Sequence, residues 1–447
     1  MHSRRYERPA DTEPARFWQV HVAGDTCLQH FGYVGTAGHI ERERFVDHGL
    51  LERELKSLQE LVVEQGYREL DANADTEAIR AALAPQPIQT LPLTEHPAFE
   101  AKLLEQPHDA DAWAVYGDWL LAQGDPRGPW LELGGPRCPA QVDDDSWLGG
   151  LAPYLCDPSA RELLEPRWQH GHIVEARVSA SRRYMARPEA WELLAALLDS
   201  PASAYLERLW VGTDSRYQGW GASMEENLDA LASFGERPAL RELTVRATHD
   251  YYDISTIMIG PLDRVLAVAP RLRSLEVRGA AIGLEELRHP TLERVVIQTG
   301  GLPGVTAQAL ARAQLPAATH LSIYYGSSEY GCEASLADVR PLMTNPHLPA
   351  LEHLGLCNAE FQDELVPLLA ASPLLPRLRS LDLSLGTMGE AGARALIDAA
   401  PAFAGLECVD VSSNCLSEAM VARLRRALPK LRSTHQYPTN RYVSLSE

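Results

Sequence analysis

The sequence LRELTV at residues 240–245 returns as LRSLEV at 272–277 and as LRSLDL at 378–383. Each copy has apolar residues at its first, fourth and sixth positions, so its second half alternates as a half-buried strand does. Looser copies begin at Ile173, Leu206, Leu292, Ala318, Leu351 and Leu406, at spacings of 20 to 34 residues. Repeats of this length stack as strand–helix units on their neighbours. The sequence therefore predicts an α/β fold with parallel strands.

Helical sequences fill the spaces between these predicted strands. They are ELLAALLD at 192–199, LDRVLAVAP at 262–270, LVPLLAASP at 365–373 and ARALIDAAP at 393–401. The pattern resembles the leucine-rich repeat of the ribonuclease-inhibitor type, which implies a solenoid with parallel strands inside and helices outside. Asn414, in VDVSSN, matches that family's ladder asparagine. Four leucines at the fourth position of their repeats are expected to be interior: Leu243, Leu275, Leu354 and Leu381.

A different pattern opens the chain. The stretch RFWQVHVAGDTCLQHFGYVGT at 16–36 alternates around a Gly24-Asp25 turn, as a β-hairpin does. Leu51, Leu55, Leu58 and Val62 then recur at helical spacing, and Gly66 ends the helix. The sequence predicts a small α+β domain in which one helix backs an antiparallel sheet.

This domain resembles the WGR domain, a module of poly(ADP-ribose) polymerases and of many bacterial proteins. The resemblance rests on Phe17-Trp18, on Phe31-Gly32-Tyr33 and on Gly66-Tyr67. The Trp-Gly-Arg signature is replaced here by Phe31, Gly32 and Tyr33. The resemblance implies the fold, but the arginine that meets DNA in the polymerase relatives is a tyrosine, which lacks the cation and the donors that bind phosphate.

The segment at 95–133 resembles a short helical companion domain that precedes repeats in planctomycete and myxobacterial proteins. Its hallmarks here are Tyr116-Gly117-Asp118-Trp119-Leu120 and the turn from Gly124 to Gly128. Asp118 and Asp125 are interpreted as a helix-surface carboxylate and a turn residue. The expected organisation is a WGR-like domain at 1–72, a linker at 73–94, the companion and N-terminal cap at 95–169, and the leucine-rich repeats at 170–447.

Composition limits the classes of function. The chain has 447 residues and a formal net charge of −20, so nucleic-acid binding requires a local basic patch. The seven cysteines have no CxxC spacing, which indicates neither a disulfide framework nor a zinc cluster. No signal-peptide core is found, and no apolar stretch is long enough to cross a bilayer. We expect a cytoplasmic protein with no membrane partner.

Aromatic residues gather in the loops after three predicted strands. They are Tyr217 and Trp220, then Tyr251 and Tyr252, and then Tyr324, Tyr325 and Tyr330. Aromatic side chains are enriched in protein interfaces, so these loops are the predicted partner-binding rim. Asp214, Asp250, Asp253 and Glu329 make the rim acidic and favour a partner with a basic segment. Loops that pack on themselves are the alternative interpretation.

Catalytic patterns are poor. His170 and His172 are spaced as two metal ligands, but no Cys or carboxylate completes a site, and a polar entry to the first repeat explains them better. The P-loop, GxSxG and Rossmann patterns are missing from the sequence. We therefore expect neither a metal nor a cofactor, and no enzymatic activity.

Two functional hypotheses remain. The first is a non-catalytic scaffold or adaptor that binds a protein through its repeats, with the WGR-like domain as a second binding module. The second is a nucleic-acid-linked regulator or damage sensor that binds DNA through the WGR-like domain. Arg42 and Arg44 are the candidate nucleic-acid contacts of the second hypothesis. The tyrosine at position 33 and the acidic charge favour the first.

Overall fold

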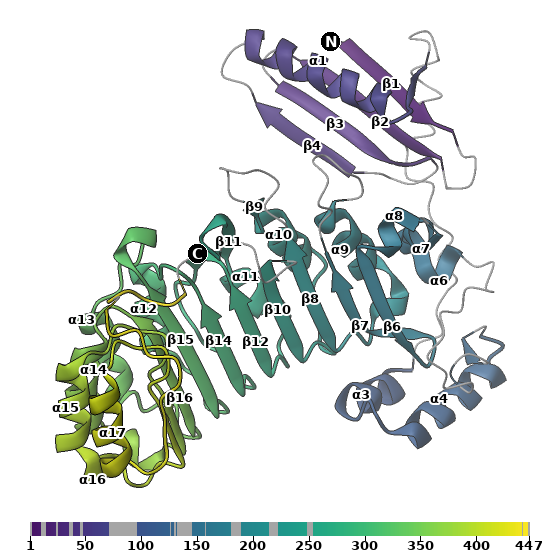
Figure 1. The fold of residues 1–447 in the computed structure, drawn as a ribbon. Coiled ribbons are helices and arrows are strands. Elements are labelled where there is room, and N and C mark those ends of the chain that lie inside the picture. Colours follow the sequence, from purple (N-terminus) through teal and green to yellow (C-terminus); the bar gives the residue numbers. More distant parts are fainter. Residues whose placement is uncertain are drawn as a thin grey trace.

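Figure 1 shows an α/β structure with a large sheet and a smaller N-terminal sheet. The computed structural model describes residues 2–9, 15–23, 26–34, 39–44, 48–70, 96–125, 127–128, 131, 145–156, 158–179, 189–213, 222–247, 254–439 and 441–445. The predicted α/β class is confirmed at this level.

The large sheet has eleven strands in the order β19-β18-β17-β16-β15-β14-β12-β10-β8-β7-β6. β6 and β7 pair antiparallel, and the other neighbouring pairs are parallel. Each of the nine repeat copies forms a strand, as predicted. The repeat copies form β7 to β18, and β6 and β19 are the two edge strands of the sheet. The eleven strands of the sheet are β6 (Leu164–Gln169), β7 (His172–Val178), β8 (Arg208–Thr213), β10 (Glu242–Ala247), β12 (Ser274–Arg278), β14 (Arg294–Gln298), β15 (His320–Gly326), β16 (His353–Ala359), β17 (Ser380–Asp382), β18 (Cys408–Asp410) and β19 (Leu431–Arg432).

Helices cover one face of this sheet (Figure 1). They are α9 (Ala190–Asp199), α10 (Glu225–Ser233), α11 (Asp263–Val268), α12 (Gly304–Ala311), α13 (Leu336–Val339), α14 (Gln362–Ala370), α15 (Glu390–Asp398), α16 (Ala400–Phe403) and α17 (Glu418–Ala427). Single 3-10 turns join them: η2 (Pro201–Ser203), η3 (Ile254–Thr256), η4 (Ser328–Tyr330), η5 (Arg340–Thr344) and η6 (Leu375–Arg377). A small parallel sheet has the order β13 (Ala280–Gly283), β11 (Ile257–Pro261), β9 (Ala222–Ser223). Within the described residues, no helix is both long and apolar enough to cross a bilayer.

One continuous core runs between the large sheet and its helices. Leu243 lies beside Leu275 in adjacent strands, and Leu354 lies beside Leu381. All four leucines are at most 1% exposed, as predicted. Each stabilises the fold by roughly 1.5–3 kcal/mol on burial. Asn414 is buried and donates from Nδ2 to the Leu383 carbonyl, so it joins two successive repeats.

The N-terminal sheet is antiparallel, in the order β4-β3-β2-β1-β5, and α1 packs on it. Its elements are β1 (His2–Arg8), β2 (Arg16–Ala23), β3 (Thr26–Tyr33), β4 (His39–Arg44), α1 (His48–Glu64) and β5 (Arg68–Glu69). The hairpin and the helix match the predicted elements. The sequence did not predict β1, whose residues are mostly charged, yet β1 pairs with β2 along its whole length. Trp191 of α9 completes this domain's core.

The companion segment packs beside the first strands of the large sheet. It contains α3 (Pro97–Glu105) and α4 (Ala110–Ala122), followed by α6 (Asp145–Leu148), η1 (Gly149–Leu151), α7 (Ala152–Cys156) and α8 (Pro158–Arg161). Trp113 of α4 is buried and stacks on His170, with ring centroids 4.8 Å apart. Asp125 accepts from the Arg127 backbone at 2.9 Å and from its guanidinium at 2.8 Å. Asp125 therefore shapes the turn, as predicted.

Substitution of a single interior leucine tests this core. We expect Leu275→Ala to lower the free energy of unfolding by about 2–5 kcal/mol, because it leaves a cavity between the sheet and its helices. Ser274→Ala, at the adjacent half-buried position of β12, is the control and should change stability by less than about 0.5 kcal/mol. Urea denaturation of both variants measures the difference. Equal stability of the two variants would contradict the burial pattern.

Candidate interaction surface

The second face of the large sheet carries no helix among the described elements (Figure 1). Along β10, buried residues alternate with half-buried or exposed ones, as expected when only one face of a strand is covered. Side chains on the open face therefore form rows that run from strand to strand. The middle row follows the strand register through Arg177, Trp210, Thr244, Glu276, Val296, Ser322, Gly355, Asp382 and Asp410.

Arginine dominates the end of this face formed by β7 to β12. The Arg177 guanidinium lies 4.1 Å from the centroid of the Trp210 ring. Burial lowers the pKa of Arg246, and the nearby cation of Arg278 lowers it further. Glu276 lies 3.8 Å from Arg246 and offsets part of this repulsion. These residues are not among those predicted from the sequence. Their signal was present in the spacer positions of each repeat, which alternate with the buried positions.

Carboxylates, histidines and thiols occupy the other end, formed by β15 to β18. Asp382 and Asp410 lie in adjacent strands of the middle row. The rings of His320 and His353 are 5.8 Å apart. Burial lowers the pKa of His320 to about 4, and the cation of Arg294 contributes, so this ring is neutral at pH 7. Glutamates lie among the arginines at the first end, where Glu175 pairs with Arg208 at 2.7 Å, and Asp410 at the second end pairs with Arg432 at 3.5 Å. The open face is thus weakly polarised, with an excess of cations toward one end and of carboxylates toward the other.

The only serine–histidine contacts in the described chain lie at this end. Ser380 Oγ is 2.6 Å from His353 Nδ1, and Ser322 Oγ is 3.0 Å from His320 Nε2. A nucleophilic serine needs a histidine that a third group orients. Among the described residues, no carboxylate hydrogen-bonds to either histidine. The described residues also contain no group of three or more side chains that could ligate a metal ion.

The aromatic residues predicted to bind a partner have different positions. Tyr324 is half-buried on the open face, two positions after Ser322 of the middle row, and Tyr330 is half-buried in η4. Tyr325 is 2% exposed and packs against Phe361, with ring centroids 5.1 Å apart, so its predicted role as a surface contact is wrong. The reason is that β15 continues to Gly326, which turns Tyr325 toward the core. Tyr217, Trp220, Tyr251 and Tyr252 lie outside the described residues.

The signature of the N-terminal domain faces the rest of the chain. Phe31 and Tyr33 are 4% and 3% exposed. Tyr33 accepts a hydrogen bond from Arg16 at 3.1 Å, and its ring meets that of Tyr154 in α7 edge-on at 5.0 Å. The ring centroids of Phe31 and of Trp191 in α9 are 6.4 Å apart. The signature residues therefore form an intramolecular contact. Arg42 and Arg44 lie in β4, and their side chains are outside the described residues.

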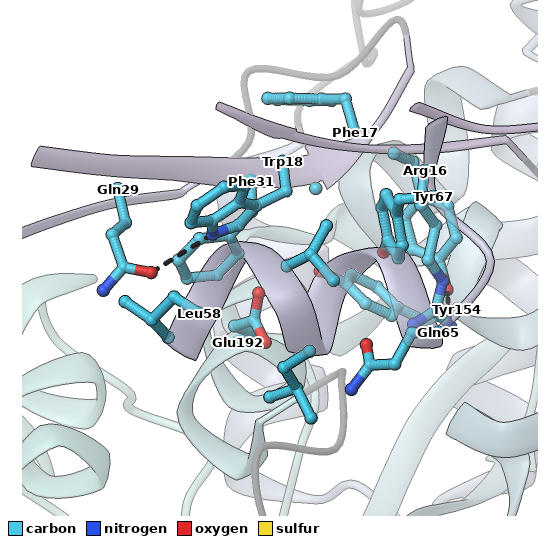
Figure 2. A pocket seen from close by; sticks show the side chains of 14 residues that line it. Arg16, Phe17, Trp18, Gln29, Phe31, Leu58, Gln65, Tyr67, Tyr154 and Glu192 are labelled. Carbon is cyan, nitrogen blue, oxygen red and sulfur yellow. Dashed lines mark hydrogen bonds between the residues drawn. The ribbon is translucent and has the colours of Figure 1, made fainter. Parts of the chain in front are cut away.

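Figure 2 shows the cavity beside this contact. Trp18, Leu58 and Tyr67 line it from the N-terminal domain, while Tyr154 lines it from α7 of the companion segment and Glu192 from α9. Its volume is about 50 Å³, which accommodates a few water molecules. Sites for small molecules and cofactors are usually about 300–1,000 Å³. The cavity is therefore a packing feature of the domain contact rather than a ligand site.

His170 and His172 form part of an aromatic cluster. The His172 ring meets Trp147 at 5.0 Å and Tyr205 at 4.8 Å, both edge-on. His172 Nδ1 lies 2.9 Å from the His170 carbonyl oxygen. Burial lowers the pKa of His172 to about 3. The histidine is therefore neutral at pH 7 and packs among aromatic side chains in the interior, whereas the sequence predicts a polar entry to the first repeat.

Comparison with known proteins gives a likeness of fold alone. No protein-family model matches the chain, and no curated protein matches it. A crystal structure of a Bacteroides fragilis protein, determined by a structural genomics consortium, is similar over 100% of this chain and 99% of its own. The TM-score is 0.50 and the sequence identity is 19%.

A double-mutant cycle tests the contact between the N-terminal domain and α7 of the companion segment. We expect Tyr33→Ala and Tyr154→Ala to be coupled by about 0.5–1.5 kcal/mol in the free energy of unfolding, the range for aromatic pairs. The control cycle combines Tyr33→Ala with Tyr437→Ala, at the far end of the chain, and should show no coupling. Additive effects of Tyr33→Ala and Tyr154→Ala would mean that the two rings do not meet.

The buried histidine predicts a dependence of stability on pH. The unfolded His172 binds a proton below about pH 6.5, whereas the folded His172 does so only below about 3. Stability therefore falls as the pH falls through this window, by up to about 1.4 kcal/mol per pH unit. We expect His172→Phe to make the pH dependence shallower by this amount, as measured by urea denaturation between pH 6.5 and 4. An unchanged slope would contradict the assignment.

Proposed function

We propose that this protein is a non-catalytic scaffold or adaptor that binds a protein partner on the open face of the large sheet and along its rim. The observation that supports this most is a polar, polarised strand face that no described helix covers (Figure 1). In this proposal the large sheet is a leucine-rich-repeat solenoid of the ribonuclease-inhibitor type, and the N-terminal domain is WGR-like.

The dimensions of the face fit a protein partner. Strands β7 to β18 place nine strands side by side in the sheet. At about 4.8 Å between strands they span about 40 Å, and three alternating positions along a strand cover about 13 Å. The outline of the face is therefore about 500 Å², within which Val296, Ser322 and Cys357 are buried. The rim supplies the remainder of the about 800 Å² that each partner contributes to a standard interface.

The charges of the face give the partner an orientation. Arg177, Arg246 and Arg278 lie toward one end, and Asp382 and Asp410 lie toward the other. A partner with a basic segment would place that segment over β16 to β18. Such complementarity contributes mainly to specificity and to the rate of association. Trp210, held under Arg177, supplies an aromatic anchor of the type that dominates binding energy in protein interfaces.

The WGR-like domain serves as an internal brace and a second binding module in this proposal. Tyr33 takes the place of the DNA-contacting arginine and packs against Tyr154. Binding of DNA through these signature residues would require the domain to leave this contact. The damage-sensor hypothesis therefore has less support than the scaffold hypothesis. Cys332, Cys357, Cys408 and Cys415 are free thiols, which favours the proposed cytoplasmic location.

Affinity capture with a variant of the face tests the proposal. The double variant Trp210→Ala/Arg278→Glu removes the anchor and reverses one charge, and Val305→Ala, at an exposed position of α12 on the helical side, is the control. We expect proteins that are recovered from the source cells by the wild type and by the control to fall roughly tenfold with the double variant. Equal recovery by all three proteins would contradict the proposal. Salt-sensitive binding of nicked duplex DNA by the wild type would favour the alternative.

A further inference from the structure

The C-terminal segment at 441–445 lies along the rim of the large sheet rather than beside the last helix. In Figure 1 the chain turns back after α17 and ends near the middle strands. Ser444 donates its backbone N–H to the Leu385 carbonyl at 2.8 Å, in the loop after β17. Leu445 reaches Asn358, at the end of β16. This part of the rim lies next to η4, which contains Tyr330.

Two contacts recognise the backbone of the segment and therefore do not depend on its sequence. Asn358 is fully buried, and its Oδ1 accepts from the Leu445 N–H at 2.9 Å. Its Nδ2 donates to the Leu445 carbonyl at 2.5 Å. The Asn358 amide thus pairs with the backbone of a single residue, as a neighbouring strand would. The Leu385 carbonyl adds a second anchor at Ser444.

Three further contacts involve the side chains of the segment. Asp363 accepts from Arg441 at 2.6 Å, and Glu329 accepts from the Tyr442 hydroxyl at 3.1 Å. Val443 is 3% exposed, so its side chain is buried. Backbone hydrogen bonds for affinity and alternate side chains for specificity are the usual division in recognition of an extended peptide.

Asp363 is fixed in place before the segment arrives. Its Oδ1 accepts from the backbone N–H groups of Gly389 and Gly392 at the start of α15, at 2.8 and 3.0 Å. The other oxygen, Oδ2, faces Arg441. A carboxylate held by the fold loses little side-chain entropy on pairing with an arginine. The acidic side chain is thus preorganised for a basic residue.

From these contacts we infer that the rim formed by Asn358, Asp363, Leu385 and Glu329 is a binding groove for an extended peptide with the order Arg, aromatic, Val, followed by two residues that are bound through their backbone. The chain's own residues 441–445 occupy the groove in cis. This inference rests on the proposed scaffold function and deepens it, because it assigns the basic partner segment to a site and a sequence pattern. A partner segment binds there by displacing the C-terminal segment.

Removal of the C-terminal segment tests the groove directly. The chain is ended at Thr439, and a fluorescent synthetic peptide of residues 439–447 is the probe, with anisotropy as the measurement. We expect saturable binding by the shortened chain and binding at least roughly tenfold weaker by the full chain, whose groove is filled. In the shortened chain, Asp363→Asn should weaken binding roughly tenfold, since it removes the charge and keeps an oxygen for α15.

The control for this charge is Glu286→Gln, which removes another carboxylate paired with an arginine, Arg288, at 2.5 Å. It should leave peptide binding unchanged. If the shortened chain does not fold, the full-length variant Arg441→Ala/Tyr442→Ala replaces it, because that variant keeps the whole chain and loses only two side-chain contacts. A folded shortened chain that shows no saturation up to about 1 mM peptide would overturn the inference. An Arg441→Ala/Tyr442→Ala variant that binds the peptide no more tightly than the wild-type full chain would overturn it as well.

The assay also separates this inference from the scaffold proposal. Trp210→Ala lies on the open face and should not change peptide binding. Peptide binding without capture of any partner would support the groove and leave the scaffold proposal without support. Capture of a partner that is lost with the face variant, together with no peptide binding, would overturn the groove and leave the scaffold proposal intact.

Discussion

Burial of one side of every parallel strand is the constraint on which the rest of this structure depends. Each repeat supplies leucines such as Leu275 and Leu354 that are almost fully buried between the sheet and its helices. Because successive side chains of a strand point to opposite faces, the same constraint leaves the spacer residues on an open face. The fold therefore produces its own candidate binding surface, and the repeats need only vary the spacers to change its chemistry.

The junction with the N-terminal domain follows a second rule, that apolar faces must find partners. Phe31 belongs to the N-terminal domain and Trp191 to α9, yet their ring centroids lie 6.4 Å apart and both residues share one core. Tyr33 has an aromatic neighbour in Tyr154, with ring centroids 5.0 Å apart. An arginine at position 33 would have to be buried beside Arg16, at a cost in desolvation and repulsion. The tyrosine suits a domain that packs against the rest of the chain.

The sequence predicted the large sheet well because its period is strong and local. All nine strands appear where the repeats are, and the helices lie between them. It missed β1, because Tyr6 is the only large apolar residue of that strand and pairing with β2 supplies the rest of its stability. It also misplaced Tyr325. The alternation of Leu321, Ile323 and Tyr325 within β15 indicates burial of Tyr325, but the six-residue repeat pattern ends at Ile323 and does not include it. The inward orientation of the signature and the position of residues 441–445 depend on contacts between distant segments, which a local pattern does not contain.

Hydroxyl-radical footprinting of the protein, alone and with its captured partner, locates the face to which the partner binds. We expect protection of Trp210, Tyr324 and His353 on the open face. We expect no protection of Val305 and Met258, two large exposed apolar residues outside that face. Protection of Val305 and Met258 with unchanged reactivity of Trp210, Tyr324 and His353 would place the partner on the helical side and contradict the proposed binding face.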